Sequence, residues 1–356
     1  MRISNDLITH IKENLKRSIR LNPDEMALLN QDLIALELKE QNFKKIDCDK
    51  TNQDTDKEPV EYVAIDGGNS SVVETNFFIL DFVKVAIINF VEKKTKDIKI
   101  LSGFISATYI KDTKTKNPVI QCKITDYKGE LKKYAPEILE FESAKLSPNE
   151  LKDTINLIRK EIEYQLLNSI CSEKQNSVIL RDGSLINLTN QTFSNEELIK
   201  NIYNSSRANN NQVFGVSKDS LIYTNHGNHL TSLLYFIAKQ NKETNKDSWL
   251  IQVGETKNEP KIGIFIAQLN KKAKVCFRID SFREDSIKSF SLLTKISKDP
   301  SFLGYPYPLI IADKFARVSN EEARLIKQVI EKSIKNSDLS KLENFFNSHK
   351  FLDSIR

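Results

Sequence analysis

The sequence predicts an α/β protein in which helices flank a mixed β-sheet core. Segments rich in β-branched and aromatic residues follow one another from Glu61, separated by turns of Lys, Asp and Thr. Between them lie segments whose apolar residues recur at helical spacing, the longest running from about Pro148 to about Cys171. Because the two kinds of segment alternate without an internal repeat, one α/β domain with a mixed sheet is expected.

The first 45 residues predict an N-terminal helical hairpin. The apolar face of the first helix consists of Leu7, Ile8, Ile11, Leu15 and Ile19. Asn22 would cap the second helix, with Pro23 at its first position and Glu25 completing a capping box. The apolar stripe of that helix consists of Met26, Leu29, Leu33 and Leu36. Residues 46–60 are acidic and offer little to bury, so they predict a linker.

Residues 61–335 are expected to form the main domain. Its first four strands, predicted within residues 61–66, 76–91, 97–110 and 117–127, form an antiparallel meander. The long helix then leads to a buried strand that ends at Asp182. A helix capped by Ser194, with Glu197 completing the capping box, follows over residues 196–207. Further strands are predicted within residues 212–220, 248–255, 261–269, 273–280 and 307–313.

The end of the chain predicts helices. The strand at residues 307–313 leads into a helix that Ser319 caps, with Glu322 at its third position. Residues 336–356 are expected to form a C-terminal helical tail.

Composition limits the class of protein. No apolar run approaches the roughly 20 residues that a membrane-spanning helix needs, and the N-terminus is too polar for a signal peptide. The four cysteines are far apart and form no CxxC pair, so we expect buried thiols in a reducing compartment, the cytoplasm. The formal charge of +5 permits a nucleic-acid partner if the positive charge is concentrated on one face.

Two acids mark the candidate site. Asp66 in AIDGG and Asp182 in LRDGS each follow an apolar strand and precede a glycine. If the two strands are neighbours, both carboxylates face one crevice, where oxygen ligands would suit Mg²⁺ or Mn²⁺. Such a metal site could cleave phosphodiester bonds. The alternative is that each Asp-Gly pair is an ordinary turn.

A third carboxylate is expected from the long helix. Glu163 lies beside the face of Ile162 and Leu166, and Glu161 is the other candidate. Either glutamate could instead be solvated and paired with a basic neighbour on the helix. Lys218 follows another strand and could hold the scissile phosphate or position the attacking water, although a lysine in a turn is also common.

Two histidines in NHGNH, His226 and His229, could bind metal or phosphate. No carboxylate lies close to them in the sequence, which favours a role unrelated to metal.

Four motifs resemble those of the NurA-domain nucleases. AIDGGNSS, LRDGSL, FGVSKDS and GYPYPLIIAD occur in the order, and at roughly the spacing, of the family's motifs, over about Glu61 to Val318. The resemblance implies that Asp66, Asp182 and Glu163 are metal ligands and that Lys218 is an active-site lysine. Tyr305, Tyr307 and Asp313 belong to the last motif. Some family members carry histidine in place of Asp313, so its role as ligand, orienting group or strand cap stays open.

The resemblance also implies properties of the whole protein. They are an RNase H-like fold, Mn²⁺-dependent (or Mg²⁺-dependent) DNA cleavage, a homodimer, and a HerA-type hexameric ATPase as partner in DNA end processing or antiviral defence. The sequence contains no GxxxxGK[ST] motif, so a motor would come from that partner. Two alternatives remain: a catalytically weak adaptor of a DNA-translocating ATPase, and an RNase H-like ribonuclease or integrase.

Overall fold

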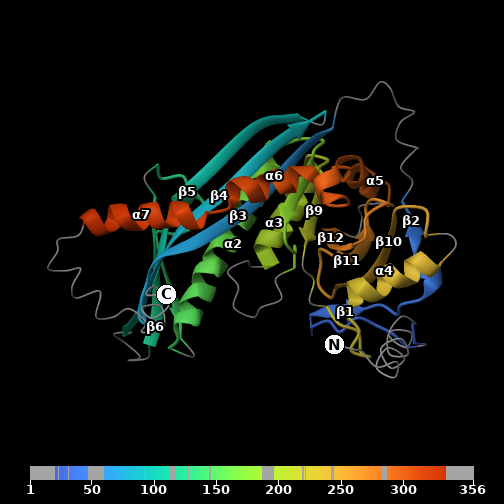
Figure 1. Ribbon diagram of the computed structural model, residues 1–356, viewed down its shortest axis with the longest axis horizontal. Coiled ribbons are helices and arrows are strands. Elements are labelled where there is room, and N and C mark those ends of the chain that lie inside the picture. Colours follow the sequence, from blue (N-terminus) through green and yellow to red (C-terminus); the bar gives the residue numbers. More distant parts are fainter. Residues whose placement is uncertain are drawn as a thin grey trace, which may run out of the picture.

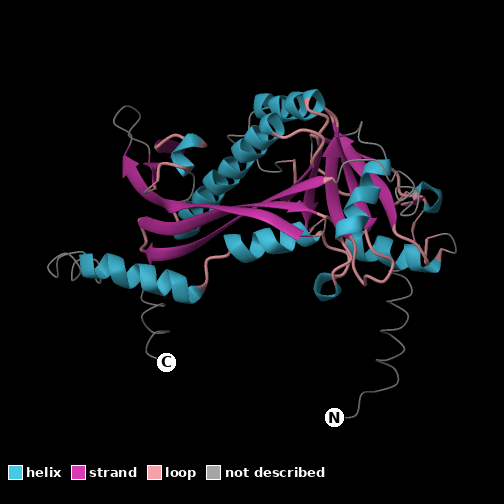
Figure 2. Cartoon of the chain, turned by 90° about the horizontal axis from the view of Figure 1, so that it is seen from above, coloured by secondary structure: helices cyan, strands magenta, loops and turns pink. Residues whose placement is uncertain are grey.

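The computed structural model describes most of the chain from residue 21 to residue 333. The described residues are 21–22, 24–30, 32–46, 60–92, 94–111, 118–126, 128–143, 146–186, 196–218, 220, 222–241, 244–282 and 287–333. They form one twelve-stranded mixed sheet. Helices lie on both faces of this sheet, as Figures 1 and 2 show. Within these residues, no helix combines the length and apolar character needed to span a bilayer.

The sheet is built around an antiparallel meander. The strands are β1 (Leu33–Ala35), β2 (Lys44–Lys45), β3 (Glu61–Glu74), β4 (Phe78–Val91), β5 (Lys94–Lys111), β6 (Pro118–Thr125), β7 (Ile138–Glu142), β8 (Val178–Asp182), β9 (Gln212–Ser217), β10 (Trp249–Thr256), β11 (Ile262–Gln268) and β12 (Phe277–Phe282). Their order is β1-β10-β11-β12-β9-β8-β3-β4-β5-β6-β7, with β2 also paired to β10. The predicted meander, β3 to β6, is confirmed. β8 pairs in parallel with β3, and β9 pairs in parallel with β8.

The helices cover the two faces of this sheet. They are α2 (Pro148–Glu173), α3 (Glu196–Ala208), α4 (Leu230–Gln240), α5 (Ile287–Ile296), α6 (Tyr307–Ala316) and α7 (Asn320–Ser333), and the short 3-10 helices are η1 (Glu40–Asn42), η3 (Leu131–Lys133) and η4 (Pro300–Phe302). One apolar core lies between the sheet and α2 with α3, and another lies between the opposite face and α5 with α6. α4 packs over β10 and β11 in a third core. Because β11 is covered on both faces, all seven of its residues are buried.

The long helix α2 follows its sequence pattern. Ser147 caps it by accepting a hydrogen bond from the Glu150 backbone N–H, and Pro148 occupies the first turn. Its predicted buried side chains, Leu151, Ile155, Ile158, Ile162 and Leu166, are all at most 1% exposed. The predicted cap of α7 is also confirmed, since the Glu322 N–H donates to Ser319 Oγ over 3.1 Å.

The prediction of a second helix in the N-terminal hairpin is wrong. Glu25 Oε2 accepts the Asn22 N–H over 3.1 Å, as in a capping box, but the chain continues into β1 and β2 instead of a helix. Both strands pair antiparallel with β10, which otherwise would expose one edge. Leu33 thereby joins the core of Trp249 and Val253.

The predicted strand at residues 307–313 is also wrong, because this segment is the start of α6. Pro308 in the first turn favours a helix, and Leu309, Ala312 and Ala316 are buried at helical spacing. A short apolar run such as PLIIA does not distinguish the two structures by periodicity. The predictions for residues 7–19, the linker at 47–59, the cap at Ser194 and the tail at 336–356 lie outside the described residues.

Candidate active site

The acids of the first two motifs lie side by side. β3 and β8 run parallel with Ile65 opposite Arg181, so Asp66 and Asp182 are the next residues on neighbouring strands. Asp182 ends β8, and Gly183 then turns the chain with a φ of +104°. The expected strand end at Asp66 is wrong, since β3 continues to Glu74 along β4. What ends at Asp66 is the pairing with β8, and this leaves room for the two carboxylates.

A third acid comes from α6. Asp66, Asp182 and Asp313 each offer a carboxylate oxygen, and these oxygens all lie within 4.8 Å of one another. Gly68 makes this approach possible, because a Cβ atom at that position would lie 2.5 Å from the carbonyl oxygen of Ala316 at the end of α6. The sequence had left the role of Asp313 open, and the structure places its carboxylate beside those of Asp66 and Asp182.

Burial and mutual repulsion disfavour the charged form of Asp66. Desolvation, and then the negative charges of Asp182 and Glu163, raise the pKa of Asp66 to about 8. A bound cation would offset both effects. The oxygen donor set and its spacing therefore fit a divalent metal such as Mg²⁺ or Mn²⁺.

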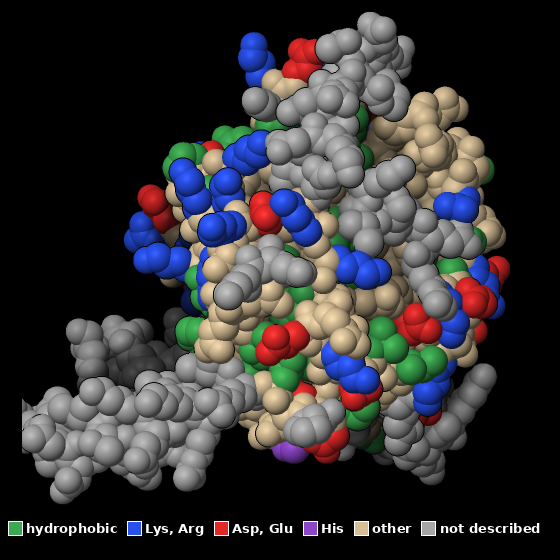
Figure 3. Space-filling view, turned by 90° about the vertical axis from the view of Figure 1, so that its right-hand side faces the viewer, with side chains coloured by type: hydrophobic (Ala, Val, Ile, Leu, Met, Phe, Trp, Pro, Cys, Tyr) green, Lys and Arg blue, Asp and Glu red, His purple; other side chains and the backbone are tan. Residues whose placement is uncertain are grey.

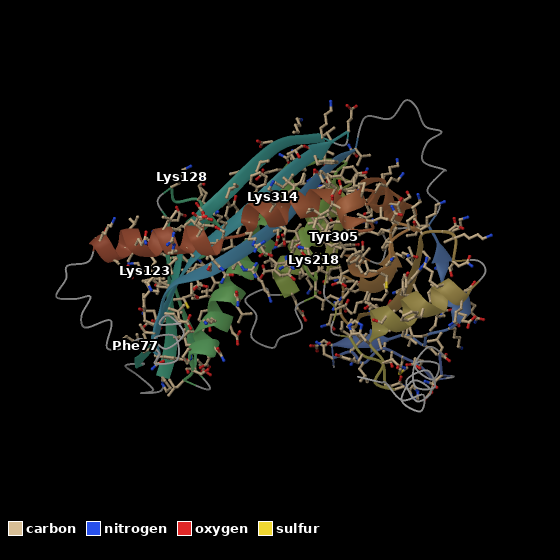
Figure 4. All side chains as sticks on the ribbon, viewed as in Figure 1. Phe77, Lys123, Lys128, Lys218, Tyr305 and Lys314 are labelled. Atoms are coloured by element: carbon tan, nitrogen blue, oxygen red, sulfur yellow. The ribbon has the colours of Figure 1, made fainter. Side chains whose placement is uncertain are left out.

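Lys218 partly balances this negative charge. Its Nζ lies 2.7 Å from Asp182 Oδ2 and 2.6 Å from Asp313 Oδ1. Partial burial acts to lower the pKa of Lys218, but the two carboxylates outweigh it and raise that pKa. Lys218 therefore stays charged at neutral pH. Figure 4 shows it beside Tyr305, whose ring centroid is 5.4 Å from the ammonium nitrogen.

Tyr305 places a hydroxyl group in the site. The residue is 4% exposed, and its ring packs edge-on against Phe277 with centroids 5.1 Å apart. Its hydroxyl group faces Asp182, whose carboxylate can accept a hydrogen bond from it. Burial, and then the charge of Asp182, raise the pKa of Tyr305 well above its usual range. The hydroxyl therefore keeps its proton and can act as a hydrogen-bond donor in the site.

Glu163 faces the same site from α2. It lines a cleft of about 390 Å³ together with Asp66 and Asp182. Arg181 Nη2 donates to Glu163 Oε2 over 2.8 Å, and Arg159 Nη1 donates to Glu163 Oε1. Its carboxylate is not among the three that lie within 4.8 Å. The other candidate, Glu161, lies away from this cleft and accepts a hydrogen bond from Gln165.

His226 and His229 of NHGNH do not lie among the site carboxylates of Asp66, Asp182 and Asp313. His226 Nε2 lies 2.9 Å from Asp24 Oδ1, and His229 lines a neighbouring cleft. Three cysteines, Cys122, Cys171 and Cys276, are buried free thiols, as predicted, and burial raises the pKa of each to about 12. The chemistry of the described site therefore rests on its carboxylates, Lys218 and Tyr305.

The order of these residues along the chain is that of a known family. The model of the NurA domain matches residues 60–318, which contain all the strands from β3 to β12 and all the site residues above. The chain belongs to the NurA family. No curated protein matches it.

The chain is similar to several solved structures at low sequence identity. The NurA nuclease from Sulfolobus solfataricus is 16% identical, with a TM-score of 0.51 over 93% of this chain and 95% of that one. Endonuclease V from Ciona intestinalis, solved with an inosine-containing DNA, is 13% identical with a TM-score of 0.37, covering 73% and 85% of the two chains. Human endonuclease V is 11% identical with a TM-score of 0.38, covering 89% and 98%. The NurA likeness extends over nearly the full length of both chains.

Proposed function

We propose that this NurA-family protein is a metal-dependent deoxyribonuclease that hydrolyses phosphodiester bonds. The main support for the proposal is that Asp66, Asp182 and Asp313 each place a carboxylate oxygen within 4.8 Å of the other two. Lys218 lies next to these oxygens. A cluster of carboxylate oxygens around a half-buried aspartate is typical of sites that bind Mg²⁺ or Mn²⁺. Membership of a family that includes the NurA nuclease from Sulfolobus solfataricus supports the same reaction.

Each residue has a proposed role. Asp66 and Asp182 hold the metal, with Asp313 as a further ligand and Glu163 as the ligand on the α2 side. A carboxylate oxygen has more than one lone pair, so Glu163 can bind an arginine and a metal together. When bound, a divalent metal supplies charge that stabilises the phosphorane-like transition state and lowers the pKa of a bound water.

Lys218 and Tyr305 are proposed to act on the phosphate itself. Lys218 stays charged and lies beside the carboxylates, so it can neutralise negative charge that builds up on the phosphate oxygens. Tyr305 keeps its hydroxyl proton and can donate it to the same oxygens or to the departing one. Arg159 and Arg181 hold Glu163 in place and so position it.

The wider assignment follows from the family resemblance. We propose that β3, β4, β5, β8 and β9 form an RNase H-like core, which the two parallel pairings beside the meander support. We further propose Mn²⁺ as the preferred ion, a homodimer as the assembly and a HerA-type hexameric ATPase as the partner. The process would be DNA end processing or defence against foreign DNA.

A cleavage assay tests the function directly. Labelled single-stranded DNA, duplex DNA and RNA are incubated with Mn²⁺, Mg²⁺ or EDTA. We expect metal-dependent DNA cleavage that Asp66→Asn and Asp182→Asn abolish, while Asp97→Asn, an exposed acid on β5, retains it. Wild-type protein that binds the ATPase but cuts nothing would identify an adaptor, and cleavage of RNA alone would identify a ribonuclease.

A further inference from the structure

A second cleft lies next to the carboxylates and shares Lys218 with them. Its volume is about 640 Å³, and it lies between α4 and the residues that lead into β12. α4 contributes Tyr235 and Phe236, and the opposite wall includes Lys274 and Val275. Phe277 in this cleft packs on Tyr305 of the active site. The cleft therefore adjoins the proposed site of cleavage.

The cleft is positively charged. No Asp or Glu lines it among the described residues, whereas Asp66, Glu163 and Asp182 line the cleft beside α2. Lys239, Lys271, Lys272 and Lys274 lie on α4 and on the turn before β12, and none pairs with a carboxylate of the described part. In Figure 3, which faces the side where α4 lies in Figure 1, Lys and Arg side chains gather among hydrophobic ones. Such a surface attracts a polyanion.

The cleft also exposes aromatic rings. Leu233, Leu234 and Ile237 of α4 are buried in the core, but Phe236 is 47% exposed at the cleft. The rings of Phe236 and Tyr235 meet edge-to-face with centroids 5.8 Å apart, which fixes the orientation of the exposed ring. Val275, on the other wall, is 49% exposed. An exposed ring beside a lysine such as Lys274, which pairs with no carboxylate of the described part, is characteristic of surfaces that stack nucleic-acid bases.

We propose that this cleft binds unpaired nucleotides of the DNA strand whose neighbouring phosphate is cut at the carboxylates. Phe236 stacks on a base, and Lys274 and Lys218 contact successive phosphates. The strand must be unpaired there, because the faces of bases in a duplex are already covered by their neighbours. This subsite rests on the proposed nuclease function and adds to it a requirement for single-stranded DNA at one side of the scissile bond.

Binding is measured apart from cleavage, in EDTA, with fluorescein-labelled oligodeoxythymidine and fluorescence anisotropy. We expect Phe236→Ala and Phe236→Leu to weaken binding at least about fivefold, the equivalent of about 1 kcal/mol for one stacked base. Leucine keeps the apolar bulk and removes the flat ring. The matched control is Phe77→Ala, since Phe77 is 41% exposed and lies far from Lys218 in Figure 4. Circular dichroism confirms that each variant is folded.

Two further measurements address stacking and charge. An oligonucleotide with one 2-aminopurine should lose fluorescence on binding wild-type protein, and less so on binding Phe236→Leu. Lys274→Ala should lower the salt dependence of binding by about one counterion, whereas Lys123→Ala, on the distant strand β6, should not. Equal affinities of the Phe236 and Phe77 variants would overturn the subsite, as would equal binding of a blunt duplex. Wild-type protein that binds as described but cuts no DNA with any metal would instead overturn the proposed function.

Discussion

Gly67 on β3 lies against Glu163 on α2, and only the absence of a side chain permits this contact. A Cβ atom at residue 67 would overlap Glu163 Oε1. The next residue, Gly68, likewise lets the backbone of α6 approach the other face of the strand, because it has no side chain. The two glycines of AIDGG therefore let two helices bring acids toward Asp66 from opposite faces of one strand.

Gly67→Ala should displace Glu163 and leave the rest of the fold in place. We expect Mn²⁺ affinity and DNA cleavage to fall at least about tenfold, the usual range when a group that supports a metal ligand is disturbed. Titration calorimetry and initial rates measure the two effects. Ser70→Ala, later on the same strand, is the control, and equal losses in both variants would contradict the specific role of Gly67.

The pKa of Asp66 predicts an unusual pH dependence of stability. Its value rises from 3.8 to about 8 in the folded protein, so the folded state keeps a proton that the unfolded state loses between these values. Metal-free stability should therefore fall as the pH rises from about 4 to about 8. Thermal unfolding in EDTA at several pH values measures this fall.

Two changes should remove that dependence. Asp66→Asn has no charge to bury, and saturating Mn²⁺ stabilises the ionised carboxylate, so each should raise the unfolding midpoint at pH 8 by at least about 2 °C. Asp97→Asn serves as the exposed control. An unfolding midpoint that rises with pH in wild-type protein and in Asp66→Asn alike would show that other groups dominate.

Glu163→Gln and Glu161→Gln separate two glutamates on one helix. Removing the charge of Glu163 leaves Arg159 and Arg181 without their buried partner, so we expect a stability loss of about 3 kcal/mol and a sharp loss of metal affinity. Glu161 only accepts from Gln165, so its variant should resemble wild type. Chemical unfolding and metal titration provide the readout. Equal behaviour of both variants would remove Glu163 from the site.

Lys218→Ala should reduce turnover more than metal binding. The ammonium group acts on negative charge that develops during the reaction, and we expect a fall in kcat of about 100-fold. Removing it also leaves Asp182 and Asp313 facing one another, so metal affinity should hold or increase. Lys128→Ala, distant from the site in Figure 4, is the control. A fall in metal affinity that matches the fall in kcat would assign Lys218 a structural role.

Deleting residues 1–46 should destabilise the protein, because it removes β1 and β2 from β10 and uncovers Trp249, Ile251 and Val253. We expect the deletion variant to unfold at a clearly lower temperature than the wild-type protein and to aggregate more. Deleting residues 1–20 keeps both strands and is the comparison. Light scattering, with and without the ATPase, reports whether either deletion alters the mass of the assembly. Equal stability of the two deletions would contradict the role of these strands.

The sequence by itself determined the elements whose patterns are local and long. α2 has an apolar face repeated over several turns and a capped start, so it could be predicted. The meander could be predicted because its strands are rich in β-branched and aromatic residues and are separated by polar turns. Asp66 and Asp182 could also be identified as candidate site residues from the local sequence pattern. Each follows a short apolar run, and the two runs proved to lie on parallel neighbouring strands.

Only the tertiary structure decided the rest, because those features depend on partners distant in the sequence. The Asn22–Glu25 contact forms as its local pattern predicts, yet the open edge of β10 draws the following residues into strands. Asp313 joins the site because Gly68 admits a helix where a short apolar run had indicated a strand. Glu163 reaches the cleft between two arginines, one of them on another element. Packing against distant residues, which local propensity does not encode, decided each of these outcomes.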